Sequence, residues 1–178
     1  CGVCGKTSLE AVAFSGCTDL EDELRVEGAL LPGLPDTLLE GQGVFARTGG
    51  LHAAGLFGAD GELHALYEDV GRHNAVDKVL GRTLLDGKLP ADDRILVVSG
   101  RASFEIVQKA LMARVPVLVA VGAPSSLAVD LSEEFGQTLV GFARGDGFNV
   151  YCGNARLIRW PQPDSSERSW QVVEVAGT

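Results

Sequence analysis

The sequence predicts an α/β sandwich, and three observations lead to that fold class. Short apolar runs at residues 94–99, 117–121 and 138–142 have the length of buried strands. They alternate with segments at 103–114 and 125–135 in which apolar residues recur at helical spacing. Such an alternation predicts a largely parallel sheet that is covered by helices. The length of 178 residues is enough for one domain of ordinary size.

Two segments ahead of this alternation are predicted from capping and turn signals. The residues from Thr37 to Glu40 have the S/T-x-x-E form of a capping box, which predicts a helix that starts there and continues to about Arg47. Residues 52–57 and 62–67 are expected to form a β-hairpin, because an Asp-Gly turn signal separates them. A hairpin beside parallel strands would make the sheet mixed.

The middle and the end of the chain complete the predicted order of elements. A helix is expected over residues 72–85, where Val76, Val79 and Leu80 recur at helical spacing. A short last strand is expected at residues 148–151. Beyond it the apolar pattern decays, and the sequence does not decide whether a strand forms near the C-terminal end.

The charge and apolar composition exclude several classes of function. The net charge of −9 argues against non-specific nucleic-acid binding, and no apolar run reaches the length of a membrane span. No signal peptide is visible, and we expect a cytoplasmic protein. The charge is uneven, however, because residues 72–114 carry eight basic and five acidic groups. This basic middle is where an anionic ligand is expected.

Two of the four cysteines, Cys1 and Cys4, form a C-x-x-C pair. Two thiols at this spacing can bind a metal, form a reversible disulfide or carry a persulfide beside a second thiol. A closed zinc site needs four ligands, and no second pair stands at a ligand spacing, so we expect no metal. Incidental cysteines near a terminus are the alternative to a chemical role.

Polar residues gather where the predicted strands end. The densest run, residues 68–78, contains Arg72 and Asn74 at a junction from strand to helix, where ligands of α/β sheets collect. The other junctions contribute His52, Ser99-Gly100-Arg101 with Ser103, Gly122 to Ser126, and Phe142 to Gly147. Together they predict one crevice for a large, phosphate-bearing ligand. Taken singly, His52 also fits a histidine at the edge of the core, and Ser103 also fits a helix cap.

These motifs together resemble the FdhD family, the sulfurtransferases that serve formate dehydrogenase as accessory proteins. The resembling stretches are Cys-Gly-Val-Cys-Gly at 1–5, Thr-Gly-Gly-Leu-His at 48–52, Glu-Asp-Val-Gly-Arg-His-Asn-Ala-Val-Asp-Lys at 68–78, Ser-Gly-Arg-Ala-Ser-Phe-Glu at 99–105, Ala-Pro-Ser-Ser-Leu-Ala at 123–128 and Thr-Leu-Val-Gly-Phe-Ala-Arg at 138–144. Family members have an additional N-terminal portion, which agrees with a chain that does not begin with Met. The resemblance defines a domain over residues 1–155 and leaves 156–178 as a tail outside it.

The resemblance implies a three-layer α/β/α sandwich that is cytidine-deaminase-like but has no deaminase zinc. It further implies that a cysteine desulfurase passes sulfur to Cys1 as a persulfide, with Cys4 assisting. The sulfur would then go to the molybdenum (or tungsten) bis-molybdopterin guanine dinucleotide cofactor before that cofactor enters formate dehydrogenase. GDP would be a partial mimic of this cofactor, and a homodimer is implied as well.

By the same resemblance, one stretch would contact the cofactor: Phe142, Ala143, Arg144, Gly145, Asp146 and Gly147. On chemical grounds we extend the expected site to His52, Arg72, Asn74, Arg101 and Ser103. Two alternatives remain at this point. One is a deaminase-like hydrolase that processes nucleotides, although neither H-x-E nor P-C-x-x-C occurs in the chain. The other is a chaperone that holds the cofactor without moving sulfur.

Overall fold

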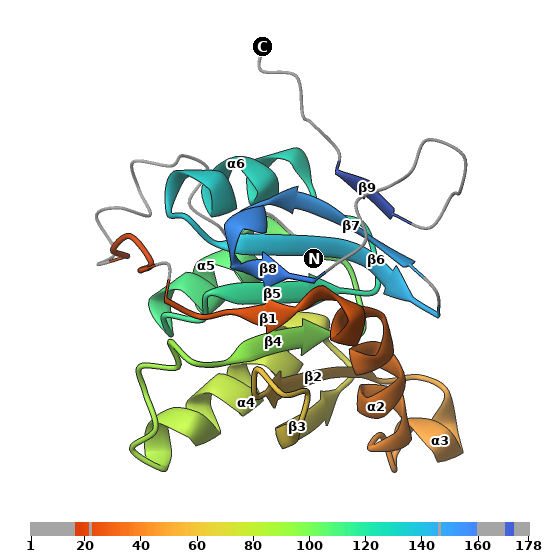
Figure 1. Ribbon diagram of the computed structural model, residues 1–178. Coiled ribbons are helices and arrows are strands. Elements are labelled where there is room, and N and C mark those ends of the chain that lie inside the picture. Colours follow the sequence, from red (N-terminus) through yellow and green to blue (C-terminus); the bar gives the residue numbers. More distant parts are fainter. Residues whose placement is uncertain (1–16, 22, 146, 160–169, 173–178) are drawn as a thin grey trace.

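The computed structural model describes residues 17–21, 23–145, 147–159 and 170–172, and its centre is a seven-stranded mixed sheet (Figure 1). The strand order is β3-β2-β4-β5-β6-β7-β9. These strands are β2 (His52–Phe57), β3 (Leu63–Asp69), β4 (Ile95–Val98), β5 (Val117–Ala120), β6 (Thr138–Arg144), β7 (Gly147–Cys152) and β9 (Trp170–Val172). Strands β4, β5 and β6 are parallel, whereas β2 runs antiparallel to both of its neighbours and β7 runs antiparallel to β6.

Layers on both faces of the sheet bury its apolar side chains. Three helices pack on one face: α4 (Arg72–Leu85), α5 (Phe104–Met112) and α6 (Ser126–Glu134). A thinner layer covers the other face: the 3-10 helix η1 (Gly28–Gly33), α2 (Leu34–Glu40), and the two-stranded sheet of β1 (Val26–Glu27) and β8 (Leu157–Ile158). Along β4, Leu96 and Val98 face the first layer and Ile95 and Val97 face the second, as the period of a strand requires. The predicted α/β sandwich with a mixed sheet is confirmed.

Most elements lie where the sequence predicts them. Helix α4 covers the predicted residues 72–85, and β2 with β3 forms the predicted hairpin. The strands and helices of the second half lie close to their expected bounds, and β9 answers the open question about the C-terminal segment by pairing with β7. In the part of the chain that the structure describes, no helix combines the length and the apolar content of a membrane span.

The helix predicted from Thr37 to Arg47 is wrong in its start and in its continuity. Helix α2 begins at Leu34, and the Thr37 hydroxyl donates backwards to the Gly33 carbonyl at 3.3 Å, so it caps nothing. The chain then turns through residues 41–43, and a separate short helix, α3 (Phe45–Thr48), follows.

Packing against β3 explains this break. At Gly41 a Cβ atom would lie only 2.7 Å from Cδ1 of Leu66, so a larger residue would have to displace the Leu66 side chain where the turn passes the strand. The start of α3 is stabilised from outside the helix, because the Glu68 carboxylate of β3 accepts hydrogen bonds from the N–H groups of Val44 and Phe45 at 2.9 and 2.7 Å.

Candidate functional site

The carboxyl ends of four strands lie along one edge of the sheet. Strands β4, β5 and β6 are parallel. Strand β3 runs in the same direction as these three, because β3 and β4 are both antiparallel to β2, which lies between them. The reversed strand β2 begins at the same edge with His52, which pairs with Asp69 at the end of β3. Helices α4, α5 and α6 follow β3, β4 and β5 directly, so their N-termini point to this edge and favour anions there.

A cavity of about 450 Å³ opens at this edge. Its strand side consists of His52, Ser99, Val121, Ala143 and Arg144. Its other side comes from α2, α3 and the turn between them, and includes Asp36, Leu38, Leu39, Gln42 and Phe45. The predicted strand-end residues His52, Ala143 and Arg144 therefore share one cavity, and its size falls within the range of small-molecule sites.

His52 is held by the first residue after β4. The hydroxyl of Ser99 accepts the N–H of Ala53 at 2.8 Å and lies 3.4 Å from Nδ1 of His52. If the hydroxyl donates its own proton to Nδ1, the neutral imidazole carries its proton on Nε2. His52 then has an N–H donor for a ligand in the cavity that it lines.

Glycines let two arginines approach this edge closely. Cδ of Arg72 and Nδ1 of His52 each lie 3.4 Å from the position that a Cβ at Gly100 would occupy. A Cβ at Gly122 would lie 2.9 Å from Cγ of Arg101 and 3.1 Å from its backbone N and Cα. Nε of Arg72 is buried and has no hydrogen-bond partner among the described residues. A buried donor of this kind is uncommon unless a ligand or water completes it.

The end of β6 has an irregular backbone. The register of β6 against β7 shifts between Gly141 and Arg144, and Phe142 has a positive φ of 54°. Phe142 is 39% exposed at this end of the strand. Gly145 follows with a φ of 53°, and Gly147 begins β7. Asp146 lies outside the described residues.

The structure places two expected site residues in other contacts. The Asn74 amide donates to Asp69 at 3.0 Å, and Lys78 forms an ion pair with the same carboxylate at 2.6 Å. Lys78, the N–H of Gly71 and Asn74 lower the pKa of Asp69 to about 2.

Ser103 has a different partner. It occupies the N-cap position of α5, but its hydroxyl makes no capping bond and lies 2.9 Å from Nε2 of His73. Burial, and after it the charge of Arg72, lowers the pKa of His73, so His73 is neutral near pH 7. The alternative interpretation of Ser103, as a residue whose side chain caps helix α5, is therefore wrong.

Sequence reasoning missed the side of the cavity formed by residues 34–45. The capping-box pattern directed attention to a single helix, and no motif marks Asp36 or Gln42 as ligand residues. What marks this side is the exposure of an apolar residue of α2 that lines the cavity, Leu39, at 51%. Exposure depends on tertiary contacts, so the linear pattern does not give it.

The predicted sulfur-carrying residues Cys1 and Cys4 lie outside the described residues. The structure describes the other two cysteines, and neither is suited to nucleophilic chemistry. Cys17 is buried. Burial raises the pKa of Cys152 to about 12, and its thiol donates to the Gln137 carbonyl at 3.4 Å.

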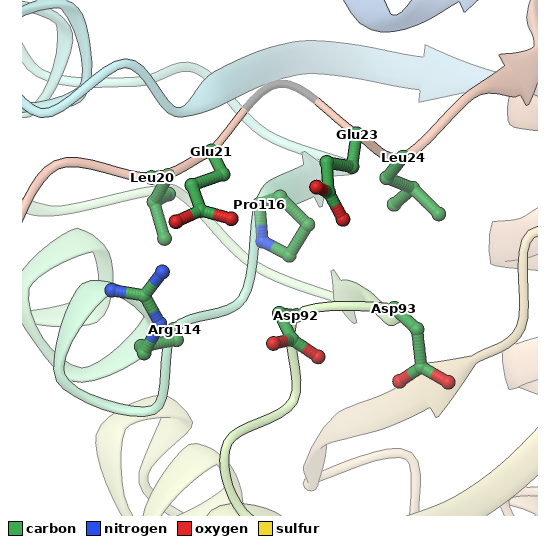
Figure 2. Close-up of a pocket in the computed structure, with 8 residues that line it drawn as sticks. All are labelled: Leu20, Glu21, Glu23, Leu24, Asp92, Asp93, Arg114 and Pro116. Atoms are coloured by element: carbon green, nitrogen blue, oxygen red, sulfur yellow. The ribbon is translucent and has the colours of Figure 1, made fainter.

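A second cavity, of about 280 Å³, lies at the opposite ends of β4 and β5 (Figure 2). The side chains of Asp92 and Asp93 come from the segment before β4, and Glu21 and Glu23 come from the N-terminal segment (Figure 2). Arg114 is the basic residue among those that line this cavity. The negative charge at this end is unsuited to phosphate, so the two ends of the parallel strands differ in electrostatic character.

The fold and this edge define the class: an α/β sandwich with a ligand cavity beyond the carboxyl ends of its strands. The chain belongs to the FdhD/NarQ family, whose model matches residues 1–158. The family predicted from the motifs is thereby confirmed.

Relatives and a solved structure agree with this assignment. A protein of Streptomyces avermitilis named "Sulfur carrier protein FdhD" is 58% identical over 159 residues, which are 88% of this chain and 56% of the relative. A protein of the same name from Sulfurisphaera tokodaii is 51% identical over 158 residues, which are 89% of this chain and 60% of the relative. The crystal structure of a protein described as a formate dehydrogenase accessory protein from Desulfotalea psychrophila matches with a TM-score of 0.73 and 31% identity, over 84% of this chain and 62% of that one. The chain thus spans little more than half the length of the curated relatives that it matches.

Proposed function

We propose that this chain is part of a sulfur carrier that works in the cytoplasm and serves formate dehydrogenase. In this proposal a cysteine desulfurase supplies the sulfur as a persulfide. The acceptor is the molybdenum or tungsten bis-molybdopterin guanine dinucleotide cofactor, which the carrier binds as its substrate. The names of the relatives support the sulfur-carrying role, and the neighbour from Desulfotalea psychrophila supports the connection to formate dehydrogenase.

The single observation that carries the cofactor-binding half of the proposal is the convergence of donors at one sheet edge. Arg144 and His52 line the same cavity, and Arg72 lies beside His52 with a buried Nε that has no partner among the described residues. A dinucleotide carries several phosphate groups, for which guanidinium groups and helix N-termini are suitable partners. The exposed Phe142 offers a surface on which a flat ring can stack.

The sulfur-carrying half rests on the C-x-x-C pair. The thiolate of Cys1 attacks the outer sulfur of the desulfurase persulfide, so that the enzyme leaves as a thiolate and Cys1 becomes a persulfide. In a direct route the outer sulfur passes to the acceptor and Cys1 leaves as a thiolate, and the acceptor in its reduced form supplies the two electrons that convert this sulfur to sulfide. In a second route the Cys4 thiolate attacks the inner sulfur, which releases hydrosulfide and leaves a disulfide between Cys1 and Cys4. A cellular dithiol must then supply two electrons to restore both thiols.

The number of residues between Cys4 and the first described residue limits how far the cysteine pair can lie from Leu20. Leu20 is anchored near the acidic cavity, since its N–H donates to the Phe135 carbonyl at 3.1 Å. Residues 5–16 can span up to about 40 Å when extended, whereas the four residues of β4, which separate the two ends of the sheet, span about 13 Å. The chain length alone does not prevent Cys1 from reaching the candidate site.

Mass spectrometry after incubation with a cysteine desulfurase and cysteine tests the sulfur-carrying half. We expect a mass increase of one sulfur atom on Cys1 or Cys4, which dithiothreitol reverses. The matched control is Cys152→Ala, because this thiol is held protonated and should carry no sulfur. No adduct on either cysteine would contradict the proposal.

Two further measurements separate the alternatives. If Cys1→Ala and Cys4→Ala both support full maturation of formate dehydrogenase, the protein is a chaperone that moves no sulfur. Stoichiometric zinc with turnover of a free nucleoside would instead favour a deaminase-like hydrolase. The proposal also includes GDP binding at the candidate site and a homodimer, which calorimetry and sedimentation velocity would test respectively.

A further inference from the structure

One side of the cavity carries a feature that phosphate binding does not explain. Asp36 lines the same cavity as Arg144 and His52. A carboxylate near bound phosphate repels it, so a site built for phosphate alone gains nothing from this residue. Asp36 is exposed, and among the described residues it has no ion-pair partner that would neutralise it. Its charge is available to a ligand that also presents N–H groups.

The second polar group on this side is the Gln42 amide. Gln42 is only 3% exposed, it lines the cavity, and its Nε2 has no hydrogen-bond partner among the described residues. The amide lies near the Glu68 carboxylate. Burial raises the pKa of Glu68, but the N–H groups of Val44 and Phe45, with a smaller contribution from Gln42, lower it overall. The Gln42 amide thus favours the ionised form of Glu68 without a hydrogen bond of good geometry, and its NH2 group still lacks a hydrogen-bond acceptor among the described residues.

The remaining surface on this side is apolar. Leu38 is buried beneath the cavity, whereas Leu39 is 51% exposed on the same helix, and Phe45 contributes an aromatic ring. An exposed leucine and a phenylalanine beside two polar groups provide the surroundings of a flat heterocycle, whose faces are apolar and whose edge forms hydrogen bonds.

We propose that this side of the cavity binds the 2-amino-4-oxopyrimidine edge that guanine and pterin share. Asp36 would accept hydrogen bonds from the ring N–H and the amino group, which are adjacent donors on that edge. The Gln42 amide would donate to the neighbouring oxo group. This inference rests on the proposed function, because the proposed substrate contains both guanine and pterin rings, and it names the residues that select them.

Nucleotide titrations of the protein by calorimetry test this selection. The expected order of affinity is GDP, then IDP, which lacks the amino group, then ADP, which lacks the whole edge. Asp36→Asn should weaken GDP binding by about 10- to 100-fold, because hydrogen bonds to a charged group are lost. The same variant should bind ADP equally well or more tightly, since a repulsive charge is removed. A loss of affinity for GDP without a loss for ADP cannot arise from loss of folding.

Two further variants act as controls. Glu40→Gln, on the same helix but outside the cavity lining, should leave every affinity unchanged. Leu39→Asp should weaken GDP and ADP alike, because it places a charge on the apolar wall rather than at the edge-binding group. Competition by guanosine or by pterin-6-carboxylate against bound GDP then tells which of the two rings occupies this side.

The outcomes separate this inference from the proposed function. Equal affinities for GDP, IDP and ADP, or an Asp36→Asn variant that keeps the preference for GDP, would overturn the selection by Asp36 while the phosphate site stands. Displacement by neither guanosine nor pterin-6-carboxylate would overturn it as well. No binding of any diphosphate would remove both the inference and the proposed cofactor site.

Discussion

Replacing Gly122 by alanine is expected to strain the edge of the sheet where the candidate site lies. The new Cβ would lie 2.9 Å from Cγ of Arg101 and 3.1 Å from its backbone N and Cα. Carbon atoms pack best at about 3.5–4.0 Å, so roughly half an ångström of overlap must be relieved. The backbone cannot move freely here, because the N–H of Gly122 donates to the Gly100 carbonyl at 3.0 Å.

Overpacking of this size costs about 1–3 kcal/mol, and we expect that loss in the free energy of unfolding of Gly122→Ala. Urea denaturation followed by circular dichroism measures it, and GDP titration should show weaker binding because Arg101 is displaced. Gly81→Ala is the matched control. Gly81 lies inside α4 with no atom within 4 Å of its added Cβ, so alanine should stabilise the protein by about 0.5–1 kcal/mol. If both variants change stability in the same direction, the steric argument at Gly122 is wrong.

Three further outcomes follow from the structure. Arg144→Ala should weaken GDP binding about tenfold and reduce its dependence on salt, whereas Arg159→Ala, at an exposed residue that directly follows β8, should do neither. Titrations at two salt concentrations compare the two variants. The pKa of Asp69 lies at about 2, below its usual 3.8, so its ionised form stabilises the fold above pH 3.8 and this contribution is lost as the pH falls towards 2. Asp69→Asn should therefore flatten the stability profile in that window, and an unchanged profile would contradict the assignment. Arg156→Ala should lower the free energy of unfolding by about 2–4 kcal/mol, because the buried guanidinium donates to the carbonyls of Gly136 and Glu21 at 2.6 and 2.9 Å. Urea denaturation measures this change, and a loss below about 0.5 kcal/mol would show that water replaces the guanidinium as the partner of these carbonyls.

The sequence was informative wherever local pattern and tertiary packing agree. Helix α4 has its apolar residues at helical spacing, and those same residues, among them Val76 and Val79, are buried against the sheet. The strand-end motifs were also predictable as neighbours, because parallel strands end at the same edge. That topological rule, together with the predicted hairpin that brings the start of β2 beside the end of β3, places His52, Arg72 and Arg101 together without any knowledge of side-chain positions.

Prediction failed where a distant residue replaces a local interaction. The capping box at Thr37 is a short-range pattern, but α3 is stabilised at its start by Glu68, which is 24 residues from Val44. Similarly, Ser103 stands at an N-cap position but bonds to His73 of another helix, 30 residues away. Both pairings depend on how β3, α4 and α5 pack, and a linear pattern holds no record of that packing.

The net charge of −9 conceals a separation that matters for the proposed function. The acidic side chains Asp92, Asp93, Glu21 and Glu23 surround the cavity at one end of the parallel strands, whereas Arg144, His52 and three helix N-termini meet at the other. Salt screens exposed charges beyond about 8 Å, so each end acts on a ligand by its local charge rather than by the total. A substrate with several phosphates is therefore attracted to one end and repelled from the other. An acidic protein can in this way keep a site that favours a strongly anionic ligand at one end of its sheet.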